Sequence, residues 1–280
     1  MPELKLADAL ALVRRERRAG HWNRVETLCR AILDSSPAHH EARGLLAGAL
    51  RAQGRQEEAI ACYRQILHHY PDDARGHNNV ANALKEAGAY DEALAAYRRA
   101  IELQPDYALA HNNLGVAMFD RQDFDAAEAS FRRSIELEPD QVDAHKNLAS
   151  VFEETGRFEK ARPAYETALS LAPDDARLHW NYAQFLLLLG ELERGWAEYE
   201  WRWRYKGFPG PHYRFARPAL ADLNVQDRSI LVHAEQGIGD TFQFIRYARC
   251  LKDRGARVVA ALPSVLHRLL STVPGIDEIT

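Results

Sequence analysis

Hydrophobic and polar positions along most of the chain predict pairs of helices that repeat every 34 residues. In residues 74–107 the pattern predicts one helix at 74–87 and a second at 90–103, joined by a turn at Gly88. The same interval relates prolines, turn glycines, small alanines and aromatic residues: Pro37, Pro71, Pro105, Pro139 and Pro173; Gly20, Gly54, Gly88, Gly156 and Gly190; Ala59, Ala93, Ala127 and Ala161; Tyr63, Tyr97, Phe131 and Tyr165. Gln122 fills the one turn where glycine is missing. Because no such unit buries its apolar face alone, the units are predicted to stack into a solenoid.

A 34-residue period with these residues resembles the tetratricopeptide repeat. We count about six repeats, at 6–39, 40–73, 74–107, 108–141, 142–175 and 176–206. The resemblance implies a mainly α fold, with an α-solenoid over residues 1–206 and the first helix of each repeat on the concave surface.

Asparagines recur at the sixth position of four of these first helices: Asn79, Asn113, Asn147 and Asn181. An asparagine amide offers both donors and an acceptor, so it can pair with a peptide backbone whatever the side chains are. The spacing is similar to the superhelix of O-linked N-acetylglucosamine transferase, where such asparagines hold extended polypeptide. The alternative is that these amides bond to neighbouring helices and only stabilise stacking. Polar or aromatic neighbours complete the predicted groove: Asn78, Asn112, Lys146 and Trp180.

Histidines share the same period two residues earlier: His77, His111, His145 and His179. Successive copies are a full repeat apart, whereas a zinc ion needs ligands at about 2 Å. We therefore expect a packing role for them and no metal site.

Residues 196–206, WAEYEWRWRYK, interleave aromatic and charged side chains. Helical spacing places Trp196, Tyr199 and Trp203 on one face, which predicts a last helix that closes the solenoid and docks a following domain. Stacking on nucleic acid is the disfavoured alternative. Proline and glycine then mark residues 207–228 as a linker.

Residues 229–280 predict a β-α-β-α-β order, and hence a parallel sheet with right-handed crossovers. The strands are expected at 229–232, 258–262 and 276–279. The turn EQGIGD lacks a dinucleotide fingerprint, because Phe242 holds the third glycine position. Asp240 in this turn is a candidate N-cap, with Gln243 completing a capping box.

A strand followed by EQGIGDTFQFIRYA, RGARVVAAL and VPGIDEI looks like the N-terminal half of a GT-B glycosyltransferase. It is similar to the ADP-heptose lipopolysaccharide heptosyltransferase family. The resemblance implies a partial α/β nucleotide fold, and it makes Asp240 a candidate general base facing an acceptor. Gln236, Gly237 and Gly239 would form the ligand loop beside it. Since that family binds its nucleotide sugar mainly in a second half, we expect a truncated chain with no cofactor that transfers no sugar alone.

The net charge and the positions of the cysteines limit the classes of function and the cellular settings that remain. The net charge is −4, which disfavours bulk nucleic-acid binding. The three cysteines, Cys29, Cys62 and Cys250, lie far apart and favour a reducing, cytoplasmic setting. The longest apolar run, FLLLL at 185–189, is too short for a membrane span. We therefore expect a scaffold that binds an extended peptide or partner protein, or alternatively the acceptor-recruiting arm of a longer protein glycosyltransferase.

Overall fold

The computed structural model describes residues 6–208, 220, 224–235 and 237–280. The chain divides into two compact units, Met1–Leu178 and His179–Thr280. We call them the solenoid unit and the C-terminal unit, and each is described by itself. The organisation into six repeats, a linker and a partial domain stays a prediction, because most of the expected linker lies outside the described residues.

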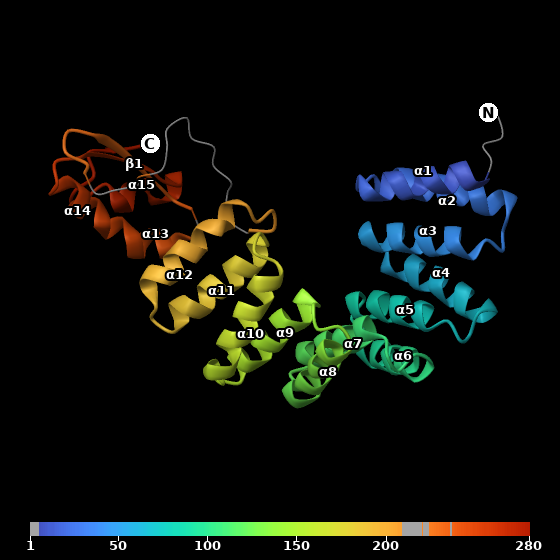
Figure 1. Ribbon diagram of the computed structural model, residues 1–280. Coiled ribbons are helices and arrows are strands. Elements are labelled where there is room, and N and C mark those ends of the chain that lie inside the picture. The colour runs from blue at the N-terminus through green and yellow to red at the C-terminus, as the bar shows by residue number, and fades with distance from the viewer. Residues whose placement is uncertain (1–5, 209–219, 221–223, 236) are drawn as a thin grey trace. The chain divides into compact units, whose positions relative to one another are not determined.

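The solenoid unit consists of helix pairs that follow one another along the chain (Figure 1). Each repeat has a first helix (A) and a second helix (B). The A helices are α1 (Leu6–Arg18), α3 (His40–Ala52), α5 (Ala74–Glu86), α7 (Ala108–Asp120) and α9 (Val142–Glu154). The B helices are α2 (Trp22–Ser35), α4 (Gln56–His69), α6 (Tyr90–Leu103), α8 (Phe124–Leu137) and α10 (Phe158–Leu171). The helices predicted at 74–87 and 90–103 are α5 and α6, which confirms the repeat register to within one residue.

The periodic small and aromatic residues form the core of this unit. Ala59, Ala93, Ala127 and Ala161 are all fully buried. The aromatic series is at most 4% exposed: Tyr63, Tyr97, Phe131 and Tyr165. An alanine lets two helices approach closely, and a ring then fills the space beside it. Consecutive A helices also contact directly, α5 with α7 and α7 with α9, which places the A helices on the inner side of the stack.

The turns between A and B helices adopt a left-handed backbone. Gly20, Gly54, Gly88 and Gly156 have φ between 70° and 80°. Gln122, in the slot without glycine, has φ 63°. A side chain in this region costs roughly 1–2 kcal/mol. The repeat therefore imposes its turn geometry even on a residue that disfavours it.

We expect Gln122→Gly to raise the free energy of unfolding of the solenoid unit by about 1 kcal/mol, because it removes this strain. The reciprocal change, Gly88→Gln, should lower it by a similar amount, since a Cβ at Gly88 meets no atom within 4 Å and only the backbone strain is added. Urea unfolding followed by circular dichroism measures both changes. Equal stability of the two variants would contradict the argument.

The periodic histidines hold the turns between repeats. In three repeats the Nε2 atom donates to the carbonyl oxygen of the proline six residues earlier: His77 to Pro71 at 2.8 Å, His111 to Pro105 at 3.1 Å and His145 to Pro139 at 2.8 Å. In the preceding repeat Arg43 occupies the same slot and donates to the carbonyl of Pro37. The packing role expected for these three histidines is confirmed.

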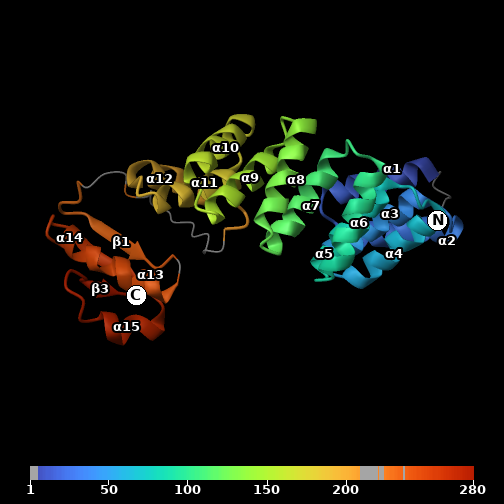
Figure 2. The same cartoon turned by 90° about the horizontal axis from the view of Figure 1, so that it is seen from below.

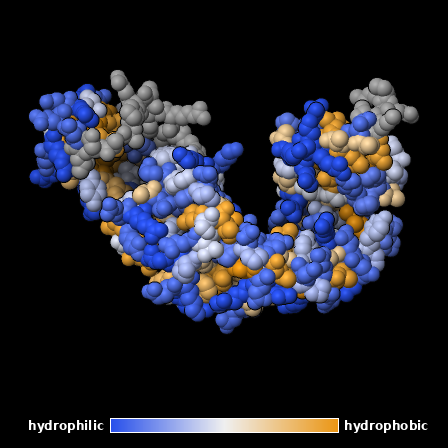
Figure 3. Space-filling model, in the orientation of Figure 1, coloured by the Kyte–Doolittle hydropathy of each residue, from blue (hydrophilic) through white to orange (hydrophobic). Residues whose placement is uncertain are grey.

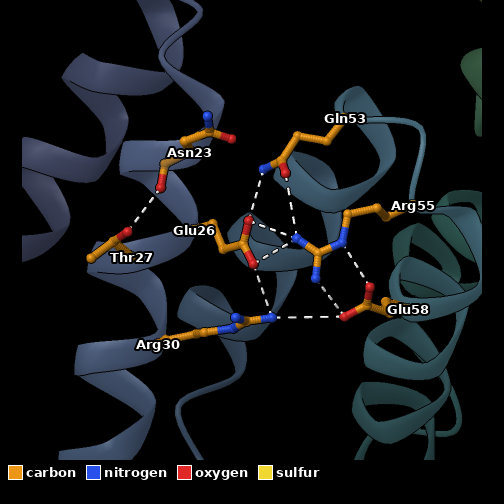
Figure 4. Close-up of polar contacts among 7 residues, drawn as sticks. All are labelled: Asn23, Glu26, Thr27, Arg30, Gln53, Arg55 and Glu58. Carbon is orange, nitrogen blue, oxygen red and sulfur yellow. Dashed lines mark hydrogen bonds and ion pairs between the residues drawn. The ribbon is translucent and has the colours of Figure 1, made fainter.

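A charged network joins the first two repeats (Figure 4). Glu26 of α2 is 8% exposed and accepts from Arg55 Nη1 at 2.7 and 2.9 Å and from Gln53 at 3.0 Å. Arg30 contacts the same carboxylate at 2.9 Å, and Arg55 also binds Glu58 at 2.7 Å. The arrangement recurs three repeats later, where Glu128 accepts from Arg157 at 2.6 Å and from Arg132 at 2.8 Å.

The C-terminal unit begins with one helix pair and continues with a small α/β segment. Helix α11 (Ala176–Leu188) enters it from the preceding unit and is followed by α12 (Leu192–Tyr199) and the 3₁₀ turn η1 (Glu200–Trp203). Strands β1 (Ser229–His233), β2 (Arg257–Ala261) and β3 (Glu278–Ile279) form a parallel sheet in the order β1-β2-β3. Between the strands lie α13 (Ile238–Phe244), η2 (Ile245–Tyr247), α14 (Ala248–Lys252) and α15 (Ser264–Leu270).

The predicted β-α-β-α-β order and parallel sheet are confirmed (Figure 2). Ser229 pairs with Arg257, and Val259 pairs with Glu278. Alternate β2 residues, Val258 and Ala260, are fully buried against the helices. The other sheet face carries Leu231, which is 44% exposed. The helices between the strands therefore pack on one face, as right-handed crossovers between consecutive strands require.

Candidate functional sites

The predicted groove residues of the solenoid unit lie side by side on three A helices. Asn113 of α7 donates its Nδ2 to Oδ1 of Asn78 on α5 at 3.0 Å. Asn147 of α9 donates in the same way to Asn112 of α7, also at 3.0 Å. We call this pair of bonds the asparagine ladder. Each donor residue uses one N–H and keeps a carbonyl oxygen and a second N–H.

The two members of each pair differ in burial. Asn78 is 1% exposed and Asn112 is 6% exposed, so their side chains lie inside the stack. Asn79, Asn113 and Asn147 are half-buried. The ladder therefore stabilises stacking through its buried members, while its half-buried members remain accessible on the inner side.

The sequence explains where the ladder ends. The residue that would accept from Asn79 one repeat earlier is Gly44, which has no side chain. At the other end the acceptor position is Lys146, whose ammonium is a donor only and binds Asp143 at 2.7 Å. Asn79 therefore occupies the donor position on α5 but forms no bond of the asparagine ladder.

Asn181 and Trp180 lie on α11 in the C-terminal unit. Asn181 is half-buried. The Trp180 ring contacts Tyr205 at 5.5 Å and Phe208 at 6.3 Å between ring centroids. The neighbouring His179 stacks on Trp201 at 3.9 Å between ring centroids, and its Nδ1 lies 2.5 Å from a Glu198 carboxylate oxygen.

The surface of the solenoid unit is mostly polar. On the face visible in Figure 3, hydrophilic and hydrophobic residues are interspersed over its helices. Among the described residues up to Leu178, the large apolar side chains that are well exposed are Leu6, Tyr70 and Leu109. Such a surface offers hydrogen bonds rather than a continuous apolar patch to a partner.

A second candidate site lies within the C-terminal unit. A cavity of about 550 Å³ opens between α11, α12 and η1 on one side and the end of β1 with α13 on the other. The residues that give it chemical character are Trp196, Tyr199, Arg202, Glu235, Asp240 and Phe244. Three of them, Trp196, Tyr199 and Arg202, belong to residues 196–206, which therefore face an α/β segment, as the aromatic face predicted there suggested.

Arg202 anchors this cavity. It is 8% exposed, and its Nε and Nη2 bind the two Glu235 oxygens at 2.7 and 3.3 Å. Its Nη1 binds Glu200 at 2.7 Å and the carbonyl of Tyr199 at 3.1 Å. Burial by itself lowers the pKa of Arg202, but the two carboxylates outweigh burial and raise it. The guanidinium stays charged, and four of its five N–H groups are engaged.

Asp240 lies in the cavity wall but is not an N-cap, so the capping hypothesis is wrong. Helix α13 begins at Ile238 with Gly237 as its N-cap, and Asp240 falls in the first turn. The helix starts earlier than expected because Gly237 already adopts the extended conformation of a cap, with φ −62° and ψ 166°. The Asp240 side chain is therefore not used to close the helix end.

The glycines of the predicted ligand loop are exposed and unstrained. A Cβ at Gly237 or Gly239 meets no atom within 4 Å. Any need for glycine at these positions would come from a ligand. Gln236, the third loop residue, lies outside the described residues.

The pairing of Arg202 with Glu235 was not predicted, because no local spacing links residues 33 positions apart.

In the part of the chain that the structure describes, no helix is both long and apolar enough to cross a bilayer. No group of three histidine, cysteine, aspartate or glutamate side chains there is arranged to hold a metal ion.

The paired helices, the 34-residue register and the inner A-helix face define an α-solenoid repeat protein. Models described as TPR repeat or tetratricopeptide repeat match residues 81–120, residues 119–175 and 146–200, and residues 17–83. The chain is a tetratricopeptide repeat protein. No curated protein matches it.

Solved structures show the same fold. A thermophilic TPR protein of Thermus thermophilus, TTC0263, is 26% identical, with a TM-score of 0.58 over 65% of this chain and 98% of that one. PilF of Pseudomonas aeruginosa is 20% identical, with a TM-score of 0.60 over 72% of this chain and 92% of that one. The Cut9 and Hcn1 hetero-tetramer of the APC/C matches at 18% identity and a TM-score of 0.61, over 69% of this chain and 40% of that one.

Proposed function

We propose that the chain is a scaffold that binds an extended polypeptide along the A helices of its solenoid unit. The observation that supports this most directly is the asparagine ladder, whose half-buried members Asn113 and Asn147 keep a free acceptor and donor on the inner side. Alternating amide donors and acceptors match the peptide backbone rather than any one side chain. A cytoplasmic setting, expected from the cysteines, remains part of the proposal.

Asn79 gives the sharpest test, because it has no ladder partner beneath it and its loss should leave stacking intact. Peptides selected from a random displayed library against the full chain provide the ligands. We expect Asn79→Ala and Asn147→Ala each to weaken their binding about fivefold, the cost of one hydrogen bond of about 1 kcal/mol. Isothermal titration calorimetry measures the affinities, and melting curves report the fold.

Asn23→Ala is the matched control, because Asn23 is an exposed asparagine on the B helix α2. It should leave affinity unchanged. If Asn79→Ala also leaves every selected peptide bound as tightly as before, the asparagines serve stacking only and the proposal fails.

A second function is favoured by the position of Asp240. It lines a cavity next to the carboxyl end of β1, the edge at which parallel sheets commonly bind ligands. Together with the resemblance to a GT-B N-terminal half, this supports an alternative in which the solenoid recruits a polypeptide acceptor for a longer glycosyltransferase. Asp240 would then be the general base.

We expect residues 1–280 alone to consume no nucleotide sugar. Turnover by this chain in a donor-hydrolysis assay would contradict that expectation.

A further inference from the structure

The cavity of the C-terminal unit carries more negative than positive charge. Among its described lining residues, the carboxylates are Glu200, Glu235 and Asp240, and the guanidinium is Arg202. Three carboxylates against one guanidinium leave two negative charges. Asp240 is exposed and forms no ion pair with a described residue, whereas Glu200 and Glu235 are both bound by Arg202. One of these two negative charges lies on Asp240, and the other belongs to the cluster of Glu200 and Glu235 around Arg202.

Arg202 does not offer a site for an anion. Glu235 accepts from Arg202 Nε and from one hydrogen of Nη2. Glu200 and the Tyr199 carbonyl accept from Nη1. Four of the five donors of the guanidinium are therefore used. An incoming phosphate or carboxylate would meet the surplus of carboxylates before it met a free donor. Electrostatics thus disfavour an anionic ligand and favour a cation.

Aromatic rings supply the second half of a cation site. Trp196 is 48% exposed and Phe244 is 45% exposed, and both line the cavity. Trp196 meets Tyr199 at 5.5 Å between centroids, with the ring planes at 85°. Two rings at right angles present a face and an edge, and an alkyl stem packs well against such walls. An ammonium group near a ring face is attracted by its quadrupole.

We propose that this cavity binds an alkylammonium group, with Asp240 as its ion-pair partner and Trp196 and Phe244 as the walls around its stem. The group would be carried by a lysine side chain of a polypeptide or by a free alkylamine. The cavity volume suits either, because ligand sites commonly enclose about 300–1,000 Å³. The proposal concerns a different unit from the asparagine ladder and does not depend on peptide binding there.

The test uses the full chain and three probes of equal length: pentylammonium, pentanol and pentanoate. Calorimetric titration at low ionic strength should detect binding of pentylammonium and not of the other two. Asp240→Asn should weaken amine binding about fivefold, because it removes an exposed charge partner at unchanged side-chain size. Trp196→Ala should weaken it several-fold. Added salt should weaken binding to the wild type more than to Asp240→Asn.

Asp253→Asn is the matched control, since it removes an exposed carboxylate at the end of α14 that does not line the cavity. It should bind pentylammonium as the wild type does. Melting curves confirm that each variant is folded. Equal binding of pentanol or pentanoate, or an equal loss of amine binding in Asp253→Asn, would overturn the proposal, as would no binding of the amine.

A second set of titrations distinguishes the two sources of the ammonium group. Short peptides containing one lysine are compared with the same peptides containing norleucine, which keeps the stem and removes the charge. Tighter binding of the lysine peptides than of pentylammonium supports a polypeptide ligand. Binding of free amines that exceeds that of every lysine peptide supports a small-molecule amine.

Discussion

Gly275→Ala should unfold the α/β segment of the C-terminal unit. A Cβ at this position would lie 2.4 Å from Cα and 2.5 Å from N of Arg249, and 2.8 Å from the carbonyl carbon of Ala248. All three are backbone atoms, so no rotamer change relieves the clash. The residue also has φ +96°, which disfavours any side chain. Overpacking and backbone strain together should cost about 3–5 kcal/mol.

The measurement is hydrogen exchange followed by mass spectrometry. In Gly275→Ala, protection should fall in β2 and α14 and stay unchanged in α5 to α8 of the solenoid unit. Gly239→Ala is the control, because a Cβ there meets no atom within 4 Å and its φ is ordinary. It should leave protection unchanged or raise it slightly. Wild-type protection of β2 in Gly275→Ala would show that the close approach of this turn is not structurally required.

The repeat register could be predicted from the sequence because several kinds of residue indicate it independently. Prolines, glycines, alanines and aromatic residues all report the same period, and each has one physical role in the stack. That is why α5 and α6 were placed to within one residue. The turn at Gln122 shows the strength of this constraint, since it adopts the glycine conformation without a glycine.

The hydrogen-bond partners of the side chains were harder to predict from the sequence, because they depend on contacts between repeats. The sequence allowed the asparagines either to bind peptide or to bond to neighbouring helices. The structure shows the second kind of bond, from Asn113 to Asn78. The peptide role of Asn79, Asn113 and Asn147 stays a prediction. Asp240 was misjudged as a cap because Gly237, which has no side chain to signal the role, ends the loop instead.

Removing Glu26 should weaken the junction between the first two repeats. The nearly buried carboxylate serves Arg55, Arg30 and Gln53 together, so its loss leaves several donors without an acceptor. We expect Glu26→Ala to lower the free energy of unfolding by about 2 kcal/mol. Glu128→Ala removes the equivalent network three repeats later. The two networks share no partner, so the effects of the two changes should add.

The network should also be sensitive to acid. Burial raises the pKa of Glu26, but hydrogen bonds from Arg55 and Gln53 outweigh burial and hold it below the ordinary value. An acid with a lowered pKa stabilises the fold above its unfolded pKa, about 4.3, and loses that contribution as pH falls through the folded pKa. The stability difference between wild type and Glu26→Ala should therefore be constant near pH 7 and shrink below about pH 4.5.

The residues of the next repeat suggest a second variant that should restore the stability lost in Glu26→Ala. In place of Glu26 and Arg55 it has Ile60, which is 8% exposed, and Ala89. The double variant Glu26→Ile with Arg55→Ala copies that apolar solution, and replacing a buried ion pair by packed apolar groups is often neutral. We expect its urea midpoint at pH 7 to return most of the way to wild type. If the double variant is no more stable than Glu26→Ala, the unsatisfied Arg55 donors are not the source of the loss.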